Sequence, residues 1–209
     1  METSHGSGTG VLVQVDKSKK IKDGYEGLVI TAWHVVQDDY VDGTIKVGYL
    51  NGRRARDCQV LEYDEAKDVA ALWVWVPAKD VEPLELATQG FRRGDQLVYV
   101  GLGGGTNIKD GVRSFEGNAS PPTTIEKVFA DLPLLPGDSG GPVLNSKNQV
   151  VGIISGGWFW WDSGLRSASG GYISTTWPAR ASNVGPIQTM LTKIKAGKEK
   201  EITVVVREN

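Results

Sequence analysis

Three residues with the side chains needed for nucleophilic acyl transfer lie far apart in the chain, each in a distinctive segment. His34 lies in the segment TAWHVV, Asp68 opens the segment DVAAL, and Ser139 lies in the segment PGDSGGPV. Hydrolysis by a serine needs a base that takes the hydroxyl proton and a carboxylate that holds the imidazole in the correct tautomer. We therefore predict Ser139 as the nucleophile, His34 as the general base and Asp68 as the carboxylate that orients it.

The glycines around Ser139 fit a binding site for a negatively charged oxygen. Gly137 permits a tight turn that directs its own N–H and that of Ser139 into one concavity, the predicted oxyanion hole. Gly140 and Gly141 carry no side chain that would obstruct a substrate carbonyl or the His34 ring. An apolar strand follows directly and gives the nucleophile a rigid support.

The elements that must position these side chains are short strands. Stretches of β-branched and aromatic residues, bounded by Gly, Asn, Asp or Pro, recur along the chain without helices between them. They are residues 11–15, 28–32, 44–49, 58–63, 69–76, 96–101, 124–129, 141–144, 149–154 and 171–174. This spacing predicts an all-β fold, an antiparallel barrel or sandwich. Residues 86–94 fit a crossover between two β halves.

The C-terminal region has a different pattern. Apolar residues at helical spacing from Ile187 to Ile194 predict a short helix, with Ser182 or Asn183 as its cap and Gly197 at its end. A final strand is predicted at residues 202–206 because this stretch is rich in β-branched residues.

The order His, Asp, Ser along the chain is the order found in the chymotrypsin fold. The segments around Ser139 and His34 resemble the nucleophile and histidine signatures of trypsin-like serine proteases. The segment GTGVLV, Val35 in place of a cysteine, the lack of disulfides and the position of Asp131 are most similar to the bacterial HtrA/Deg-like branch. No peptide-binding module of the kind found in that branch is expected in this chain.

The resemblance implies a fold and a domain division. The fold is two six-stranded antiparallel β-barrels with the catalytic triad in the cleft between them, His34 and Asp68 from the first and Ser139 from the second. The implied protease domain spans residues 6–180, with the first barrel at about 6–86 and the second at about 95–180. Residues 181–209 hold the predicted helix and terminal strand.

The resemblance also implies substrate-binding residues. Ser155, Gly156 and Gly157 match the family's strand that pairs with an extended substrate backbone. Pro133 and Leu134 would form the floor of the pocket for the residue before the scissile bond, and Gly157 and Gly171 its walls. Such a pocket offers no charge, so small or medium aliphatic side chains are expected there. Asp131 would change this preference if it pointed into the pocket.

One residue departs from what the resemblance implies. Asp138 stands where zymogen-derived relatives pair an aspartate with a new amino terminus, but the typical amino-terminal sequence is missing. Its partner is therefore left open at this stage. The main prediction is a serine endopeptidase acting on polypeptides. Two alternatives remain, an inactive trypsin-like scaffold that binds peptides or regulates a partner, and a module that is active only within an oligomer or a longer chain.

Composition excludes several other function classes. The net charge is −2, and the 23 Lys and Arg residues are scattered, so no nucleic-acid groove is expected. No apolar run is long enough for a membrane span, and no cofactor or metal motif is present. The single cysteine, Cys58, is predicted to be a packed thiol. Without disulfides or a signal peptide, a cytoplasmic location is favoured unless the chain is an excised domain.

Four consecutive aromatic residues stand out near the end of the second half. Residues 158–161 have the sequence WFWW and follow directly after the predicted substrate strand. They cannot all face a core from one strand, because successive side chains point to opposite faces. They are expected either to line the substrate cleft or contact a partner, or to pack within a loop.

Overall fold

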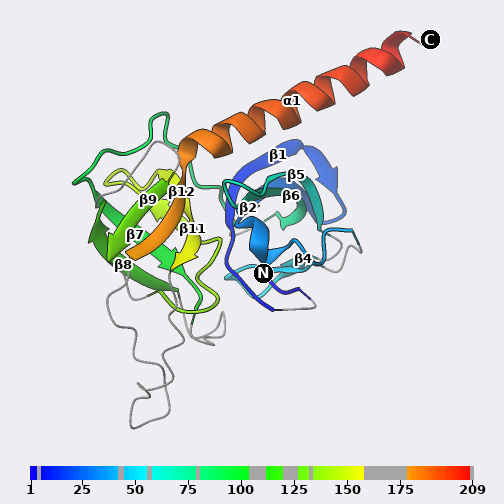
Figure 1. Ribbon diagram of the computed structural model, residues 1–209. Helices are drawn as coiled ribbons and strands as arrows, with labels where there is room; N and C mark the ends of the chain where they lie inside the picture. Colours follow the sequence, from blue (N-terminus) through cyan, green and yellow to red (C-terminus); the bar gives the residue numbers. More distant parts are fainter. Residues whose placement is uncertain are drawn as a thin grey trace.

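The computed structural model contains two sets of β-strands followed by one long helix (Figure 1). It describes residues 1–3, 6–41, 45–55, 58–78, 81–103, 112–119, 127–131, 134–157 and 178–207. The N-terminal set comprises β1 (Val11–Ile21), β2 (Gly24–Thr31), β3 (Val47–Gly48), β4 (Arg54–Ala55), β5 (Gln59–Asp64) and β6 (Val69–Pro77). The C-terminal set comprises β7 (Gln96–Gly101), β8 (Arg113–Asn118), β9 (Lys127–Asp131), β10 (Pro142–Leu144), β11 (Val150–Gly157) and β12 (Pro178–Asn183).

The pairing within each set is antiparallel. In the N-terminal set the main sheet has the order β1-β2-β6-β5, and β3 pairs separately with β4. In the C-terminal set one sheet has the order β8-β7-β10-β11-β12-β9. The predicted all-β architecture is confirmed. The last strand of the second set ends at Asn183, slightly beyond the boundary that the sequence predicted at residue 180.

Each set has its own apolar core, and a third cluster joins the two sets. This third cluster contains Ile30 and Val69 from the first set, Ile153 from the second, and Ile187 from the helix α1 (Val184–Arg207). Ile30, Val69, Ile153 and Ile187 are completely buried. Burying an aliphatic side chain of this size stabilises a fold by roughly 1.5–3 kcal/mol, so the shared cluster fixes the two sets relative to each other.

The helix α1 begins where the sequence predicted it. Asn183 directly precedes the helix, and its side-chain oxygen accepts the Val184 N–H at 2.8 Å. Ile187 and Met190 are buried against the two sheets. Beyond them the helix extends away from the strands and ends far from both sets (Figure 1).

The predicted terminal strand at residues 202–206 is wrong, because α1 continues to Arg207. The charged residues at 198–201 are good helix formers. Gly197, the predicted end, does not have a left-handed backbone and lies inside the helix. A glycine inside a helix costs only about 1 kcal/mol, which the neighbouring residues offset.

Three strands were not predicted: β8, β12 and the two-residue β4. β8 and β12 are rich in polar and small residues and lack the β-branched pattern, but β8 pairs with β7 along its whole length and β12 pairs with β11 along most of its length. Pairing with a neighbour formed earlier in the chain overrides weak local propensity. The predicted strand at 44–49 is reduced to β3, and the one at 171–174 lies outside the described residues.

Candidate active site

Strand pairing brings the histidine and aspartate segments together. β2 ends at Thr31, and the short 3₁₀ helix η1 (Trp33–Val35) that follows carries His34. Asp68 directly precedes the first residue of β6. Because β2 and β6 are antiparallel, with Thr31 opposite Ala70, the end of β2 lies beside the beginning of β6. The register of this one strand pair therefore places His34 next to Asp68.

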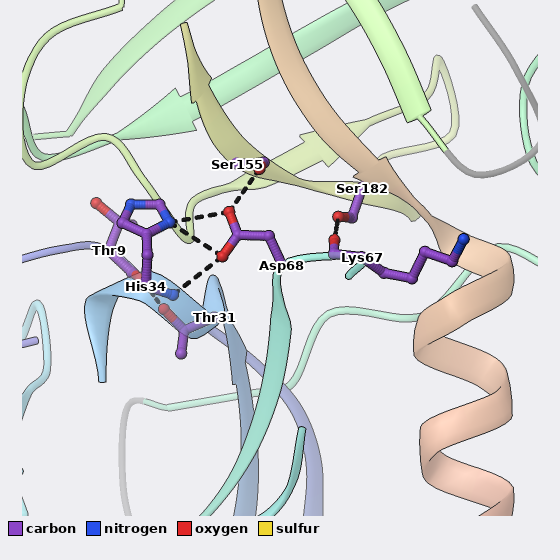
Figure 2. Close-up of polar contacts among 7 residues, drawn as sticks. All are labelled: Thr9, Thr31, His34, Lys67, Asp68, Ser155 and Ser182. Atoms are coloured by element: carbon purple, nitrogen blue, oxygen red, sulfur yellow. Dashed lines mark hydrogen bonds and ion pairs between the residues drawn. The ribbon is translucent and has the colours of Figure 1, made fainter. Parts of the chain in front are cut away.

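The side chains of His34 and Asp68 are in direct contact (Figure 2). Nδ1 of His34 lies 3.0 Å from Oδ1 and 2.9 Å from Oδ2 of Asp68. The backbone N–H of His34 also donates to Oδ1 at 3.0 Å. An ionised carboxylate can only accept hydrogen bonds, so Nδ1 carries the proton in this pair. The lone pair of Nε2 is then free to accept a proton from another group.

The environment of Asp68 keeps its carboxyl ionised. Burial by itself would raise the pKa of this group. The hydrogen bonds from His34 and Ser155, together with the attraction of a charged His34 ring, outweigh burial and hold the pKa below its ordinary value of 3.8. Asp68 is therefore an anion throughout the neutral pH range, as the partner of an imidazole must be.

Two serine hydroxyls from the second set of strands hold the turn that contains Asp68 (Figure 2). Ser155 in β11 donates to Oδ2 of Asp68 at 2.5 Å. Ser182 in β12 donates to the carbonyl of Lys67, the residue before Asp68. β11 and β12 are neighbours in the sheet, with Ile153 opposite Ser182. The second set thus fixes the carboxylate that the first set provides.

The sequence did not predict these two contacts. The sequence pattern indicates Ser155 only as part of the substrate strand, and Ser182 only as a possible helix cap. The backbone of Asp68 has a φ of 53°, a left-handed conformation that aspartate tolerates better than most residues. A left-handed residue at the start of a strand needs support from its neighbours, and the two serines provide it.

An aromatic stack connects the histidine turn to the strand that leads to Asp68. The rings of Trp33 and Tyr63 are stacked, with centroids 3.9 Å apart and an angle of 8° between their planes. Tyr40 packs edge-on against Trp33 at 5.2 Å. Trp33 is adjacent to His34, and Tyr63 is the next-to-last residue of β5. The stack restrains η1 relative to the turn that carries Asp68.

The loop of Ser139 docks on the end of the first set. Gly140 has a φ of 85°, and a Cβ at this position would overlap the Thr9 carbonyl and lie 3.1 Å from the Ala32 backbone nitrogen. The N–H of Thr9 donates to the carbonyl of Ser139 at 2.8 Å. Ala32 is two residues before His34. The close approach therefore requires a glycine after Ser139, because any side chain would push the two segments apart.

A second glycine, Gly8, lies between the same two segments. A Cβ at Gly8 would lie 2.6 Å from Cγ1 of Val35 and 3.1 Å from the carbonyl oxygen of Ser139. Val35 follows His34 directly. The segments of His34 and Ser139 thus lie on either side of Gly8.

The backbone around Ser139 leaves two donors available. Gly137 has a φ of 98°, which strongly favours glycine. The Asp138 carbonyl accepts the Gly141 N–H at 3.0 Å, and the Ser139 carbonyl accepts the Thr9 N–H. Within the described residues, the N–H groups of Gly137 and Ser139 donate to no acceptor of the protein. These are the two donors that the sequence predicted for an oxyanion hole.

The partner of Asp138, which the sequence left open, is the protein backbone. Asp138 is 1% exposed. Its Oδ1 accepts the Gly103 N–H at 2.6 Å, and its Oδ2 accepts the Leu135 N–H at 2.8 Å. A buried carboxylate is tolerated when such donors satisfy it. Asp138 thereby fastens the Ser139 loop to the segment that follows β7.

The predicted substrate strand has one edge without a strand partner among the described residues. β10 pairs with β11 only as far as Ile153, whereas β12 pairs with β11 as far as Gly157. On the β10 side, Ser155, Gly156 and Gly157 therefore extend past the described ladder. Such an edge can accept an extended peptide as an additional strand.

The predicted pocket residues are only partly described. Leu134 is 5% exposed and belongs to the core cluster of the second set. Pro133, Gly171 and residues 158–161 lie outside the described part of the chain.

The comparison with protein families decides which family this architecture represents. A sequence model described as the trypsin-like peptidase domain matches residues 8–153, a range that contains His34, Asp68 and Ser139. The chain belongs to the trypsin-like peptidase family. The family predicted from the segments around His34 and Ser139 is therefore confirmed.

Relatives of this trypsin-like domain include a bacterial serine protease and a plant protease. Serine protease Rv3671c of Mycobacterium tuberculosis is 29% identical over 153 residues, which are 67% of this chain and 37% of that protein. The chloroplastic protease Do-like 1 of Arabidopsis thaliana is 27% identical over 161 residues, 73% of this chain and 34% of that protein. The predicted similarity to the HtrA/Deg-like branch is confirmed. The match spans little more than a third of each relative's length.

Solved structures agree on the fold. The crystal structure of the inactive form of Rv3671c protease has a TM-score of 0.60 at 23% identity, covering 90% of this chain and 83% of that one. The serine endoprotease from Yersinia pestis has a TM-score of 0.60 at 18% identity, covering 88% and 61%. The trypsin-like domain thus has the chymotrypsin-like fold that the sequence predicted.

The contact between Ser155 and Asp68 leads to a prediction. Ser155→Ala removes a hydrogen bond to a charged group, which contributes about 1.5–3 kcal/mol, and leaves Asp68 less firmly held. We expect turnover of a peptide substrate to fall about tenfold or more, with a smaller change in KM. Steady-state kinetics of wild type and variant provide the measurement, with Ser18→Ala, an exposed serine of β1, as the control. Equal turnover in Ser155→Ala and wild type would show that this contact does not support Asp68.

Three further observations on the trypsin-like domain concern its cysteine, metal binding and membrane spanning. Cys58 forms no disulfide and is fully buried in the first core, as predicted. Across the described residues, no group of three His, Cys, Asp or Glu side chains is arranged to hold a metal ion. The one helix longer than a single turn in the described part of the chain, α1, is too polar to cross a bilayer.

Proposed function

We propose that this chain is a serine endopeptidase that hydrolyses peptide bonds through an acyl-enzyme, with Ser139, His34 and Asp68 as its catalytic residues. The observation that carries the proposal is the paired His34 and Asp68 beside a docked Ser139 loop whose two amide donors are available. Family membership supports the same chemistry. We further propose that the protease unit comprises about residues 6–180 together with the end of β12.

The proposed reaction assigns a role to each of the three side chains and to the two amide donors. The Ser139 Oγ attacks the carbonyl carbon of the peptide while Nε2 of His34 takes the hydroxyl proton, and the carbonyl oxygen becomes an anion. The N–H groups of Gly137 and Ser139 donate to that anion. When the intermediate collapses, the C–N bond breaks and His34 gives its proton to the departing amine. Water then attacks the acyl-enzyme with His34 as base, which releases the acid and restores Ser139.

The strand edge next to the site supports a polypeptide substrate. An extended peptide that pairs with Ser155, Gly156 and Gly157 would gain backbone hydrogen bonds that do not depend on its sequence. Because β11 also carries the hydroxyl that holds Asp68, peptide binding and the catalytic carboxylate share one strand. We propose this edge as the substrate-binding strand.

The alternative of an inactive, peptide-binding scaffold rested on the open question of Asp138. In the structure, the carboxylate of Asp138 accepts hydrogen bonds from the backbone N–H groups of Gly103 and Leu135. These donors support the endopeptidase over the scaffold, although among the described residues no hydrogen bond joins Nε2 of His34 to Ser139. We therefore retain the endopeptidase as the proposed function.

Digestion of a peptide library, with the cleavage sites identified by mass spectrometry, tests the proposal directly. We expect internal peptide bonds to be cut by the wild-type chain and not by Ser139→Ala purified in the same way. The paired variant is needed because a contaminating protease would cut in both samples. Cleavage at the same sites and rates in both would overturn the proposed function.

The same experiment measures specificity at the residue before the scissile bond. We expect faster cleavage after Val or Leu than after Arg or Glu, because an unpaired charge buried in an apolar pocket costs several kcal/mol, about a hundredfold or more in rate. Peptides that differ only between Val, Leu, Phe, Arg and Glu at this position make the comparison. Faster cleavage after Arg than after Val or Leu would show that Asp131, and not Pro133, defines the pocket.

A further inference from the structure

Thr9 occupies a central place in the hydrogen bonds around the nucleophile loop. It lies just before β1 and is 6% exposed. Its hydroxyl donates to the carbonyl of Gly137 at 2.7 Å and accepts the Leu102 N–H at 3.1 Å. Its backbone N–H donates to the Ser139 carbonyl at 2.8 Å. One residue thus binds the carbonyls on both sides of Asp138.

Thr9 is itself held in place by the first set of strands. Its carbonyl accepts the hydroxyl of Thr31, the last residue of β2, at 2.8 Å (Figure 2). Thr31 is completely buried. The strand that leads to His34 therefore also fixes the residue that contacts the nucleophile loop. The strand β2 thus holds both His34 and, through Thr9, the Ser139 loop in fixed relative positions.

The peptide unit between Gly137 and Asp138 is held at both ends. Its carbonyl accepts from the Thr9 hydroxyl, and its N–H, on Asp138, donates to the Leu135 carbonyl at 3.0 Å. Glycine has several allowed backbone conformations, so the φ of 98° at Gly137 is not fixed by the residue itself. If the carbonyl lost its donor, the peptide units around Gly137 could rotate, and the Gly137 N–H would point elsewhere.

We propose that Thr9 is a positioning residue whose hydroxyl holds Gly137 in the conformation that directs its N–H at the substrate oxyanion. The inference rests on the proposed function, since it assigns Gly137 and Ser139 as the oxyanion donors. Thr9 does not contact substrate. It acts through the Gly137 carbonyl and, through its backbone, on Ser139.

Thr9→Val and Thr9→Ser separate the hydroxyl from the rest of the side chain. Valine keeps the shape and removes the donor and acceptor, whereas serine keeps the hydroxyl. Because removing one oxyanion donor outright costs about 10²–10³ in turnover, we expect Thr9→Val to lower kcat about 10–100-fold with KM changed far less. Thr9→Ser should retain most of the wild-type kcat. Thr192→Val, in which an exposed threonine of α1 is changed, serves as the control for the substitution itself.

A tetrahedral inhibitor distinguishes positioning from general loosening. A peptide boronic acid that mimics the transition state should bind Thr9→Val more weakly by about the same factor as the loss in kcat. The matching unreactive peptide should bind both proteins equally, because it forms no oxyanion. Equal loss of affinity for both ligands, or a kcat of Thr9→Val equal to that of wild type, would overturn the inference.

Amide hydrogen exchange gives a reading that does not depend on activity. We expect the segment 134–141 to exchange faster in Thr9→Val than in wild type, Thr9→Ser or Thr192→Val, at a temperature where all four are folded. If Thr9→Val does not fold, Thr9→Ala replaces it. Unchanged exchange in this segment would contradict the inference. A wild type that hydrolyses no peptide, combined with faster exchange in the variant, would instead overturn the proposed function alone.

Discussion

Replacing Ser139 with alanine should lower peptide hydrolysis by about 10⁴–10⁶, the cost of removing a nucleophile from a catalytic triad. Without the hydroxyl, His34 has no proton to take and no acyl-enzyme forms. The fold should be retained, because the hydrogen bond that connects Ser139 to Thr9 uses the backbone carbonyl, which alanine keeps. The measurement is turnover of a peptide substrate together with a thermal unfolding curve.

The unfolding curve is the control that makes this result interpretable. A variant that loses activity and also unfolds at a much lower temperature would have lost its structure rather than its nucleophile. We expect the unfolding temperatures of Ser139→Ala and wild type to agree closely. Turnover within about tenfold of wild type in a folded Ser139→Ala would remove Ser139 from the mechanism.

Replacing Asp68 with asparagine should lower turnover by about 10⁴ while keeping the shape of the site. The amide NH₂ of asparagine favours the His34 tautomer with the proton on Nε2, which cannot accept the Ser139 proton. Asparagine also tolerates the left-handed backbone at this position, where φ is 53°. Asp64→Asn, at the last residue of β5, is the matched control. Turnover close to wild type in Asp68→Asn would show that this carboxylate does not orient the base.

The same variant has an expected effect on stability that depends on pH. The pKa of Asp68 is lower in the folded protein than its ordinary value of 3.8. The ionised group therefore stabilises the fold fully above pH 3.8, and this contribution is lost as the pH falls through the lower, folded-state pKa. We expect the difference in unfolding free energy between wild type and Asp68→Asn to be larger at about pH 7 than at about pH 3. Urea unfolding at the two values measures it, and a constant difference would contradict the lowered pKa.

The sequence alone was enough to propose the chemistry of the site, but it did not predict the contacts that support the site. His34, Asp68 and Ser139 stand in segments whose residue types are demanded by the reaction, so each could be found locally. The contact between His34 and Asp68 depends on the register of β2 against β6, which no local pattern reveals. The assignment of residues 6–180 to a protease domain stays a prediction.

The contacts that hold the site were missed because they join residues far apart in the chain. Ser155 and Ser182 reach the Asp68 turn from β11 and β12, and β12 itself lacks a strand-like sequence. One local feature of the sequence could have indicated the role of Thr9, because this residue stands between two glycines just before a strand. Such a hydroxyl is free of neighbouring side chains and can approach a backbone closely.

The fold was predicted correctly where local pattern and tertiary environment agree. β6 is apolar along its length and buried along most of it. Residues 202–206 show the opposite case, because their β-branched side chains favour a strand but they continue the helix α1. A strand forms only where a neighbour pairs with it, and the sequence of one segment does not contain that information.

The central claim is that Ser139 is an activated nucleophile, and covalent labelling tests it most directly. A fluorophosphonate reacts with a serine only when a base takes its proton and donors stabilise the oxyanion. We predict that the freshly purified wild-type chain is labelled without added protease, that the modified peptide contains Ser139, and that Ser139→Ala is not labelled. Failure of the folded wild-type chain to react, or equal labelling of Ser139→Ala, would contradict the claim.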